Sequence, residues 1–254
     1  MKPEATFMLS FVCVFLFFVS CQSESSDGGV MLADSLVLES HFVERPIDSY
    51  NYWDTLLQES GRQHQIDWML IKAVMLKESH GEPDYVSYVG AVGLMQLMPR
   101  EGSYFADSYR AYQQARKLRG KRVYNGKTQI EWGKVYQAEL QALAQRFADQ
   151  PDSLYRYDRR FHAAYNILEG GRQLAGDFQF FRSRGHGPYT SQVLAIAAYN
   201  AGRYAVMQDK SNPKLDHIPI NRQTELYVGG VQKIYLALVE NGGALPEGEE
   251  WRTY

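Results

Sequence analysis

The stretch from Leu70 to Pro99 constrains this chain more than any other part of its sequence. Ile71, Val74, Met75 and Glu78 recur at helical spacing and therefore share one face of a helix. The first three side chains are apolar and should face a core, so the carboxylate of Glu78 should lie at the inner end of an apolar stripe. Burial penalises the ionised form of a carboxyl group and should raise its pKa above the roughly 4.3 of a free glutamate. The pattern therefore predicts a general acid at Glu78.

The boundaries of this helix follow from its capping residues. Asp67 is a suitable N-cap, and Gly81 just before Pro83 is a suitable stop. Glu78 then falls in the last turn, where the helix dipole also disfavours a negative charge. The helical pattern alone leaves open a second interpretation, in which Glu78 is partly exposed at the helix end and bonds a nearby amide.

The residues that follow narrow this choice. Glu78-Ser79 is followed by Ser87 and then by the run G-L-M-Q-L-M-P at 93–99, which includes Gln96. This arrangement resembles the signature of the lytic transglycosylases of the soluble-transglycosylase (SLT) type, a branch of the lysozyme-like superfamily that cleaves bacterial peptidoglycan. In that family a serine follows nine residues after the glutamate, and a G-L-M-Q-[IL]-M-P run comes shortly after it.

Three later segments extend the resemblance. Residues 166–171 are similar to the family's N-I-x-x-G element, and residues 194–202 contain its A-Y-N-A-G motif. Residues 218–228 resemble a pattern close to I-P-x-x-E-T-x-x-Y-V. Here the chain departs from the family, because Gln223 stands where the family has glutamate and Glu225 stands where arginine is common. The departure puts in doubt any role for a second carboxylate at position 223.

The resemblance implies a mainly α fold, namely a lysozyme-like α-helical domain with an inserted helical lobe. We expect the domain at 47–240, the insert at about 101–157 and a mobile tail at 241–254. Periodicity favours helices at about 50–63, 103–118, 130–148 and 230–240. The basic turn at 116–127 could contact stem-peptide carboxylates or an anionic lipid surface, or it could be a solvated helix hairpin.

The resemblance also implies an activity, that of a lyase which breaks the bond between N-acetylmuramic acid and N-acetylglucosamine and leaves 1,6-anhydromuramoyl ends. Glu78 would act first as acid and then as base, and no cofactor or metal is expected. Ser87 and Gln96 would bond the muramoyl sugar, Tyr199 and Asn200 would hold the sugar or the backbone around it, and Tyr227 would orient Glu78. Met95 would line the groove floor or belong to the core.

Two other functions remain compatible with the motifs. One is a hydrolase of the same lysozyme-like fold, a muramidase or a chitinase, and the other is a non-catalytic peptidoglycan-binding protein in which Gln223 marks lost activity. Analysis of the products would separate the first from a transglycosylase. Sacculus binding without turnover would favour the second.

The N-terminus has the pattern of a secretory signal. The apolar run from Phe7 to Val19 suits the h-region of a signal peptide at 1–20 and is shorter than the roughly 20 residues that span a bilayer. Ser20-Cys21 resembles a lipoprotein processing site, so we expect a lipidated Cys21 that anchors the protein in a membrane, followed by a tether to residue 46. The outer membrane is favoured because Gln22 gives no inner-membrane retention signal. Ordinary secretion or an uncleaved anchor are the alternatives.

Composition excludes some partners and sites. The net charge is −2, which gives no sign of nucleic-acid binding by a basic surface. The two cysteines both lie in the targeting region, so no disulfide is expected in the folded domain, and the six histidines are scattered without metal-ligand spacing. The expected partners are peptidoglycan strands and a membrane, and protein partners are left open.

Overall fold

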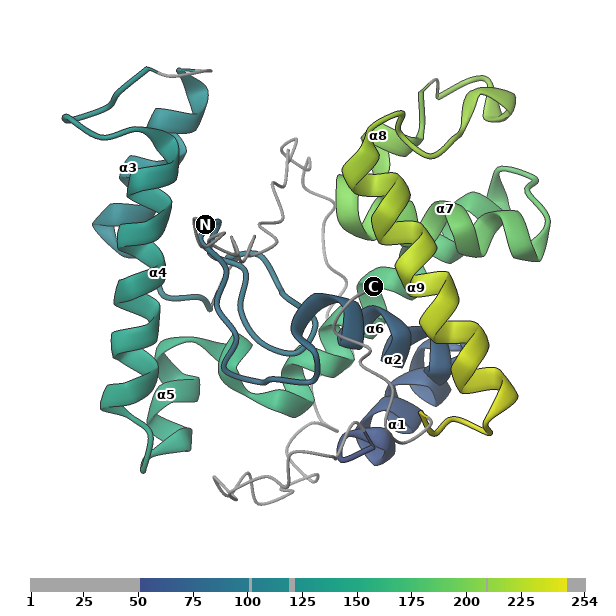
Figure 1. Ribbon diagram of the computed structural model, residues 1–254, viewed down its shortest axis with the longest axis horizontal. Helices are drawn as coiled ribbons and strands as arrows, with labels where there is room; N and C mark the ends of the chain where they lie inside the picture. Colours follow the sequence, from purple (N-terminus) through teal and green to yellow (C-terminus); the bar gives the residue numbers. More distant parts are fainter. Residues whose placement is uncertain (1–50, 101, 119–121, 209, 246–254) are drawn as a thin grey trace, which may run out of the picture.

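The computed structural model describes residues 51–245 except 101, 119–121 and 209. This part of the chain is mainly α, as predicted, and its β contacts are isolated bridges. Figure 1 shows the arrangement of the helices. Their bounds are α1 Asp54–His64, α2 Trp68–Ser79, α3 Asp107–Lys117, α4 Gln129–Arg146, α5 Pro151–Tyr157, α6 Ala163–Ser183, α7 Pro188–Ala201, α8 Arg203–Val206 and α9 Arg222–Glu240, with short 3-10 turns η2 Arg159–Phe161 and η3 Pro213–Leu215.

Helix α2, which carries Glu78, lies at the centre of the larger core. Asp67 caps its N-terminus by accepting a hydrogen bond from the Met69 amide, as the sequence predicts. The helix is buried on nearly every side, with polar Lys72 and Ser79 among the buried side chains. It packs against α1, α6 and α9. A helix surrounded in this way holds its side chains in fixed positions.

A second, smaller core lies between α3, α4 and the loop after α2. It contains Val89, Val92, Tyr112, Tyr136 and Leu140, all nearly fully buried. A capping box between Thr128 and Glu131 starts α4. In Figure 1 these helices stand apart from the bundle of α1, α2, α6, α7 and α9, with the loop after α2 between the two groups. Helices α3 and α4 thus share a second hydrophobic core with the loop after α2.

Helix α9 begins at Arg222, eight residues before the predicted start at 230. The helix passes through Gly229 and Gly230. A Cβ on Gly230 would lie 2.9 Å from Lys77 Nζ, so the glycine leaves room for the Lys77 side chain of α2. Asn221 caps the true start by accepting from the Thr224 amide.

The residues after α9 correct a second expectation. We predicted a mobile tail from residue 241, but Lys72 Nζ donates a 2.8 Å hydrogen bond to the Gly243 carbonyl, and Leu245 is buried in the larger core. Lys72 also donates to Asn51 at 2.7 Å and pairs with Asp54 at 2.6 Å. One buried ammonium thus joins both ends of the described chain to α2.

The predicted signal peptide, Cys21, the tether to residue 46 and the end of the tail at 246–254 lie outside the described residues. Among the helices whose bounds are given above, none combines the length and the hydropathy that crossing a bilayer requires.

Candidate active site

Glu78 lies in the last turn of α2 and is only 8% exposed. Burial raises the pKa of its carboxyl to about 7, while a hydrogen bond from Tyr227 and the charge of Lys77 act in the opposite direction. The alternative of a partly exposed glutamate at the helix end is therefore wrong. A carboxyl with a pKa of about 7 can both give and take a proton near neutral pH.

Tyr227 is the residue that contacts the acid directly. Its hydroxyl donates a 2.6 Å hydrogen bond to Glu78 Oε1, as the sequence predicts, and its ring is buried. One turn earlier on α9, Thr224 Oγ1 donates to Asn200 Oδ1 at 3.1 Å and so joins α9 to α7. The pair fixes the helix face that presents Tyr227 to the acid.

The loop between α2 and α3 forms the wall next to Glu78. Val92 pairs with Val86 on one side and with Leu97 on the other, so residues 85–97 make a compact double turn. Gln96 has a left-handed backbone with φ of 48°, and its side chain Nε2 donates to the carbonyls of Tyr85 and Gly93 at 3.0 and 2.9 Å. These bonds leave Gln96 Oε1 without a hydrogen-bond donor among the residues of the described chain.

Ser87 is held by the same double turn. It is partly exposed, and its Oγ accepts a 2.9 Å hydrogen bond from the Ala91 amide. Because that bond uses a lone pair of the oxygen, the hydroxyl proton stays available to a ligand.

Helix α6 supports the loop from behind. Asn166 Oδ1 accepts from the Met95 amide at 2.6 Å, and its Nδ2 donates to the Val92 carbonyl at 2.9 Å. A Cβ on Gly93, whose φ is 83°, would lie 2.7 Å from the Arg160 carbonyl, so only glycine lets the loop approach this closely. The N-I-x-x-G segment is thus structural, as its place in the sequence motif suggests.

Tyr199 connects α7 to the same loop and to the acid. Its hydroxyl donates a 2.7 Å hydrogen bond to the Met95 carbonyl. Burial raises the pKa of Tyr199 well above its ordinary value, and the nearby charge of Glu78 raises it further. Tyr199 is therefore bonded to the loop at Met95 and is close enough to Glu78 for the charge of that carboxyl to affect its pKa.

Three predicted site residues turn away from a ligand. Met95 is fully buried, and a Cβ on Gly170 would meet its Cγ at 2.6 Å, so it belongs to the core and does not line a groove. Tyr199 holds the loop backbone and is 4% exposed, and Asn200 bonds Thr224 and is 3% exposed. The Tyr199 hydroxyl and Asn200 Oδ1 thus have protein partners, whereas the buried Asn200 Nδ2 has none within the described chain. Gln223, which stands where the family pattern has glutamate, lies in the first turn of α9.

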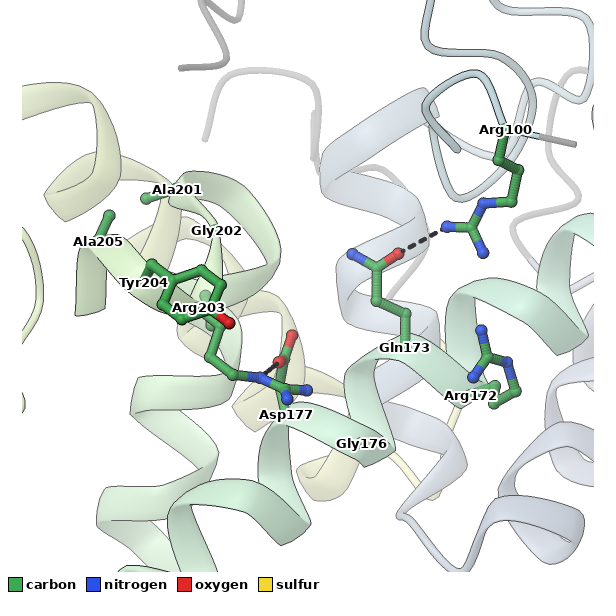
Figure 2. A pocket seen from close by; sticks show the side chains of 11 residues that line it. Arg100, Arg172, Gln173, Gly176, Asp177, Ala201, Gly202, Arg203, Tyr204 and Ala205 are labelled. Atoms are coloured by element: carbon green, nitrogen blue, oxygen red, sulfur yellow. Dashed lines mark hydrogen bonds and ion pairs between the residues drawn. The ribbon is translucent and has the colours of Figure 1, made fainter. Parts of the chain in front are cut away.

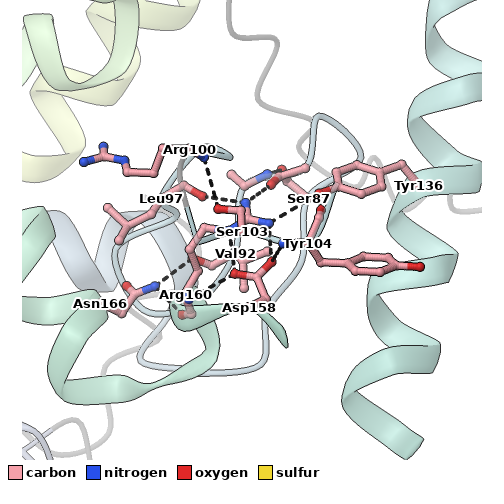
Figure 3. Close-up of polar contacts among 12 residues, drawn as sticks. Ser87, Val92, Leu97, Arg100, Ser103, Tyr104, Tyr136, Asp158, Arg160 and Asn166 are labelled. Atoms are coloured by element: carbon pink, nitrogen blue, oxygen red, sulfur yellow. Dashed lines mark hydrogen bonds and ion pairs between the residues drawn. The ribbon is translucent and has the colours of Figure 1, made fainter. Parts of the chain in front are cut away.

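A buried arginine that the sequence did not indicate ties the loop to the second core. Arg160 Nη1 donates to the carbonyls of Gly90 and Leu97, and its Nε and Nη2 donate to Asp158 at 2.9 and 2.6 Å. Tyr136 on α4 lies within 3.4 Å of the same guanidinium. Figure 3 shows Arg160 reaching between Asp158, Leu97 and the loop that carries Ser87. The sequence shows only two consecutive arginines, Arg159 and Arg160, shortly before α6, and such charged residues are common on protein surfaces.

The arrangement supports proton transfer at one carboxyl. The influences on the pKa of Glu78 are burial, Tyr227 and Lys77, and they include no second carboxylate of the described chain. Within the same residues, no group of three or more His, Cys, Asp or Glu side chains could hold a metal ion. The site can therefore donate a proton to a leaving oxygen and then remove one from an attacking hydroxyl.

Comparison with known proteins agrees with these features. The chain is 30% identical over 129 residues to membrane-bound lytic murein transglycosylase F of Stutzerimonas stutzeri. This match covers 48% of this chain and 23% of the relative. It is 30% identical over 89 residues to membrane-bound lytic murein transglycosylase E of Buchnera aphidicola. That match covers 35% of this chain and 39% of the relative. The chain thus spans less than half the length of these curated relatives.

A solved structure and a protein family also match. The structure of an inactive mutant of lytic transglycosylase Slt from Pseudomonas aeruginosa aligns with 78% of this chain and 26% of its own, at 21% identity and a TM-score of 0.42. Residues 55–167, which include Glu78, the loop at 85–97 and Asn166, match the family described as the transglycosylase SLT domain. This part of the chain is therefore similar to the transglycosylase SLT domain family.

Proposed function

We propose that this protein is a lytic transglycosylase, a carbon–oxygen lyase that cleaves peptidoglycan between N-acetylmuramic acid and N-acetylglucosamine. One observation carries the proposal, namely a buried Glu78 carboxyl whose pKa is about 7 and which lies in hydrogen-bond contact with Tyr227. The names of the relatives support the reaction class, since both are lytic murein transglycosylases.

The first step uses Glu78 as an acid. Tyr227 donates to Oε1, so the proton is carried on Oε2, which gives it to the glycosidic oxygen as the bond from that oxygen to the muramoyl anomeric carbon breaks. The N-acetylglucosamine residue leaves with a new hydroxyl. Glu78 is left as a carboxylate beside an electron-poor anomeric carbon, whose positive charge it stabilises.

The second step uses the same group as a base. The carboxylate removes the proton from the C6 hydroxyl of the muramoyl sugar while that oxygen bonds to the anomeric carbon. The product is a 1,6-anhydro ring, and Glu78 returns to its protonated form. Most glycosidases need two carboxylates, but an attacking group on the substrate itself has a high effective concentration and needs neither a second acid nor water.

The loop residues suit the binding of the acetamido sugar. Gln96 Oε1 has no donor among its described neighbours and can accept the N–H of an N-acetyl group, while the Ser87 hydroxyl proton can be donated to a sugar or acetyl oxygen. In this proposal both residues touch substrate, whereas Tyr199 and Asn200 position the wall behind them.

The cell envelope is the location that fits this substrate. The relatives are named membrane-bound, and Ser20-Cys21 in the sequence resembles a lipoprotein processing site. We propose a lipid anchor at Cys21 and an outer-membrane placement facing the periplasm. Metabolic labelling with a clickable fatty acid should mark the wild type and leave the Cys21→Ala variant unlabelled; equal labelling of both would contradict the anchor.

The experiment that tests the activity uses purified sacculi and the Glu78→Gln variant. Wild type should release muropeptides with 1,6-anhydro ends, each one water lighter than a hydrolysis product, and Glu78→Gln should release none. Glu82→Gln is the matched control, because Glu82 is an exposed glutamate four residues further along the chain, just after α2. Activity retained in Glu78→Gln would show that Glu78 is not the acid, and reducing muramoyl ends would show hydrolysis instead.

A further inference from the structure

A cavity of about 380 Å³ lies between α6, α7 and α8 and is bordered by three arginines that the reaction above does not use. Figure 2 shows Arg100 and Gln173 on one side of it, Asp177, Arg203 and Tyr204 on the other, and Gly176 on the turn of α6 between them. Small side chains form the rest of its surface, namely Ala198, Ala201, Gly202 and Ala205. The cavity therefore has an apolar lining of small residues and a charged rim.

The charges on this rim do not cancel. Glu169 accepts from Arg100 and, at 2.6 and 2.8 Å, from Arg172, so two guanidinium groups share one carboxylate. Asp177 accepts from Arg203 Nε at 2.7 Å. Three arginines thus face two acids, and one positive charge is left over.

Two of the guanidinium groups keep free donors. Arg172 uses Nε and Nη2 on Glu169, which leaves Nη1 open, and Arg203 uses Nε on Asp177, which leaves Nη1 and Nη2 open within the described chain. A Cβ on Gly176 would lie 3.8 Å from Arg203 Nη2, so no side chain at this position covers that nitrogen. Phe180 supports the Arg203 guanidinium from below, with 4.6 Å between its ring centroid and Arg203 Cζ. The donors are thus held in place and open to a ligand.

The cavity adjoins the catalytic loop. Arg100 directly follows the 93–99 run, and Ala198 directly precedes Tyr199. Ala198 lines the cavity, and the hydroxyl of the next residue, Tyr199, donates to the Met95 carbonyl in that loop. A ligand bound by these arginines would therefore lie beside the sugar that Glu78 cleaves.

We propose that this pocket binds a carboxylate of the peptide attached to the muramoyl sugar, which makes it a peptide-recognition subsite of the proposed lytic transglycosylase. The inference rests on the proposed function. A guanidinium with two open N–H groups matches a carboxylate, and the lining of alanine and glycine leaves room for small apolar side chains beside it. On a strand that carries peptides the lactyl carboxyl of the muramoyl sugar is bound in an amide, so the free carboxylates are those of the peptide.

The test compares three forms of one glycan: strands with peptides that carry free carboxylates, the same strands with amidated carboxylates, and strands from which an amidase has removed the peptides. The measured quantity is the ratio of kcat/KM for the first form to that for the second, and the third form, which carries free lactyl carboxylates, shows the effect of removing the whole peptide. We expect Arg172→Gln to lower this ratio about tenfold, since a partly exposed charge-assisted hydrogen bond contributes less than a buried one.

A second variant and a control separate binding from folding. Arg203→Gln alone would leave Asp177, 6% exposed, without its partner, so the double variant Arg203→Gln with Asp177→Asn is used, which removes one charge of each sign. It should lower the ratio as Arg172→Gln does. Arg62→Gln, which breaks a comparable i,i+3 pair with Glu59 on α1, should keep the wild-type ratio.

The outcomes distinguish this inference from the proposed function. Ratios unchanged in both pocket variants, or equal cleavage of free and amidated strands, would overturn the pocket while leaving the lyase intact. If wild type cleaved none of the strands, the proposed function would fail. Calorimetric binding of a soluble muramoyl peptide would still test the pocket in that case: affinity lost in Arg172→Gln and kept in Arg62→Gln supports it, and equal affinity in both overturns it.

Discussion

Replacing Glu78 by glutamine should stabilise the protein at high pH while it abolishes turnover. The folded carboxyl has a pKa of about 7, raised by burial from an ordinary value of 4.5. Between these two values the folded protein binds the proton more tightly than the unfolded chain does, so the free energy of unfolding falls as pH rises through this window. The resulting loss of stability amounts to about 3 kcal/mol; this loss is complete above about pH 8 and zero below about pH 4.

Glutamine avoids this cost because it stays neutral and can still accept the Tyr227 hydrogen bond. Urea unfolding of wild type and Glu78→Gln should therefore give similar free energies at pH 4.5 and a difference approaching about 3 kcal/mol in favour of the variant at pH 8.5. Glu82→Gln, at an exposed position, should not separate from wild type between these pH values. A difference between Glu78→Gln and wild type that stays constant with pH would refute the reasoning, because it would show that the carboxyl titrates alike in both states.

Two further perturbations test the surroundings of the acid. Tyr227→Phe removes the 2.6 Å hydrogen bond that lowers the pKa of Glu78, so the alkaline limb of the kcat/KM profile on sacculi should move up by about one pH unit. An unmoved limb would show that Tyr227 does not influence the pKa of Glu78. Arg160→Met leaves the fully buried Asp158 without its ion-pair partner and should lower the free energy of unfolding by about 3 to 5 kcal/mol. Arg62→Gln, at an exposed pair, should leave the free energy of unfolding nearly unchanged, and similar losses in both variants would mean that Arg160 does not anchor the loop.

The sequence predicts the parts of this site that depend on local pattern. The cap at Asp67, the helix that ends just after Glu78 and the burial of its apolar face follow from spacing and from propensity, and the structure confirms them. The contact between Tyr227 and Glu78 joins residues 149 positions apart and came only from the resemblance to a known family. Pattern alone cannot bring two such segments together.

The direction of a buried polar group is the part that the sequence could not give. A tyrosine and an asparagine at the end of α7 could face a ligand or the protein, and the choice depends on which backbone groups another segment leaves unpaired. In this fold the Met95 carbonyl accepts a hydrogen bond from Tyr199, and the Thr224 hydroxyl donates one to Asn200 Oδ1. Arg160 is a similar case, because its partners come from two loops that are distant in sequence.

The two buried acids near the loop show what distinguishes a reactive carboxyl from a structural one. Asp158 is fully buried, but it accepts hydrogen bonds from the Tyr104 amide and from the Arg160 amide and guanidinium, so a positive charge compensates its own. Glu78 is buried to nearly the same extent, and the hydrogen bond that the structure gives it comes from a neutral phenol. Burial without a full counter-charge leaves the proton on Glu78 near neutral pH, whereas burial with one makes Asp158 a fixed support. The surroundings of each acid, more than its depth in the fold, therefore decide its role, and a guanidinium introduced beside Glu78 should turn the catalytic acid into a second structural ion pair.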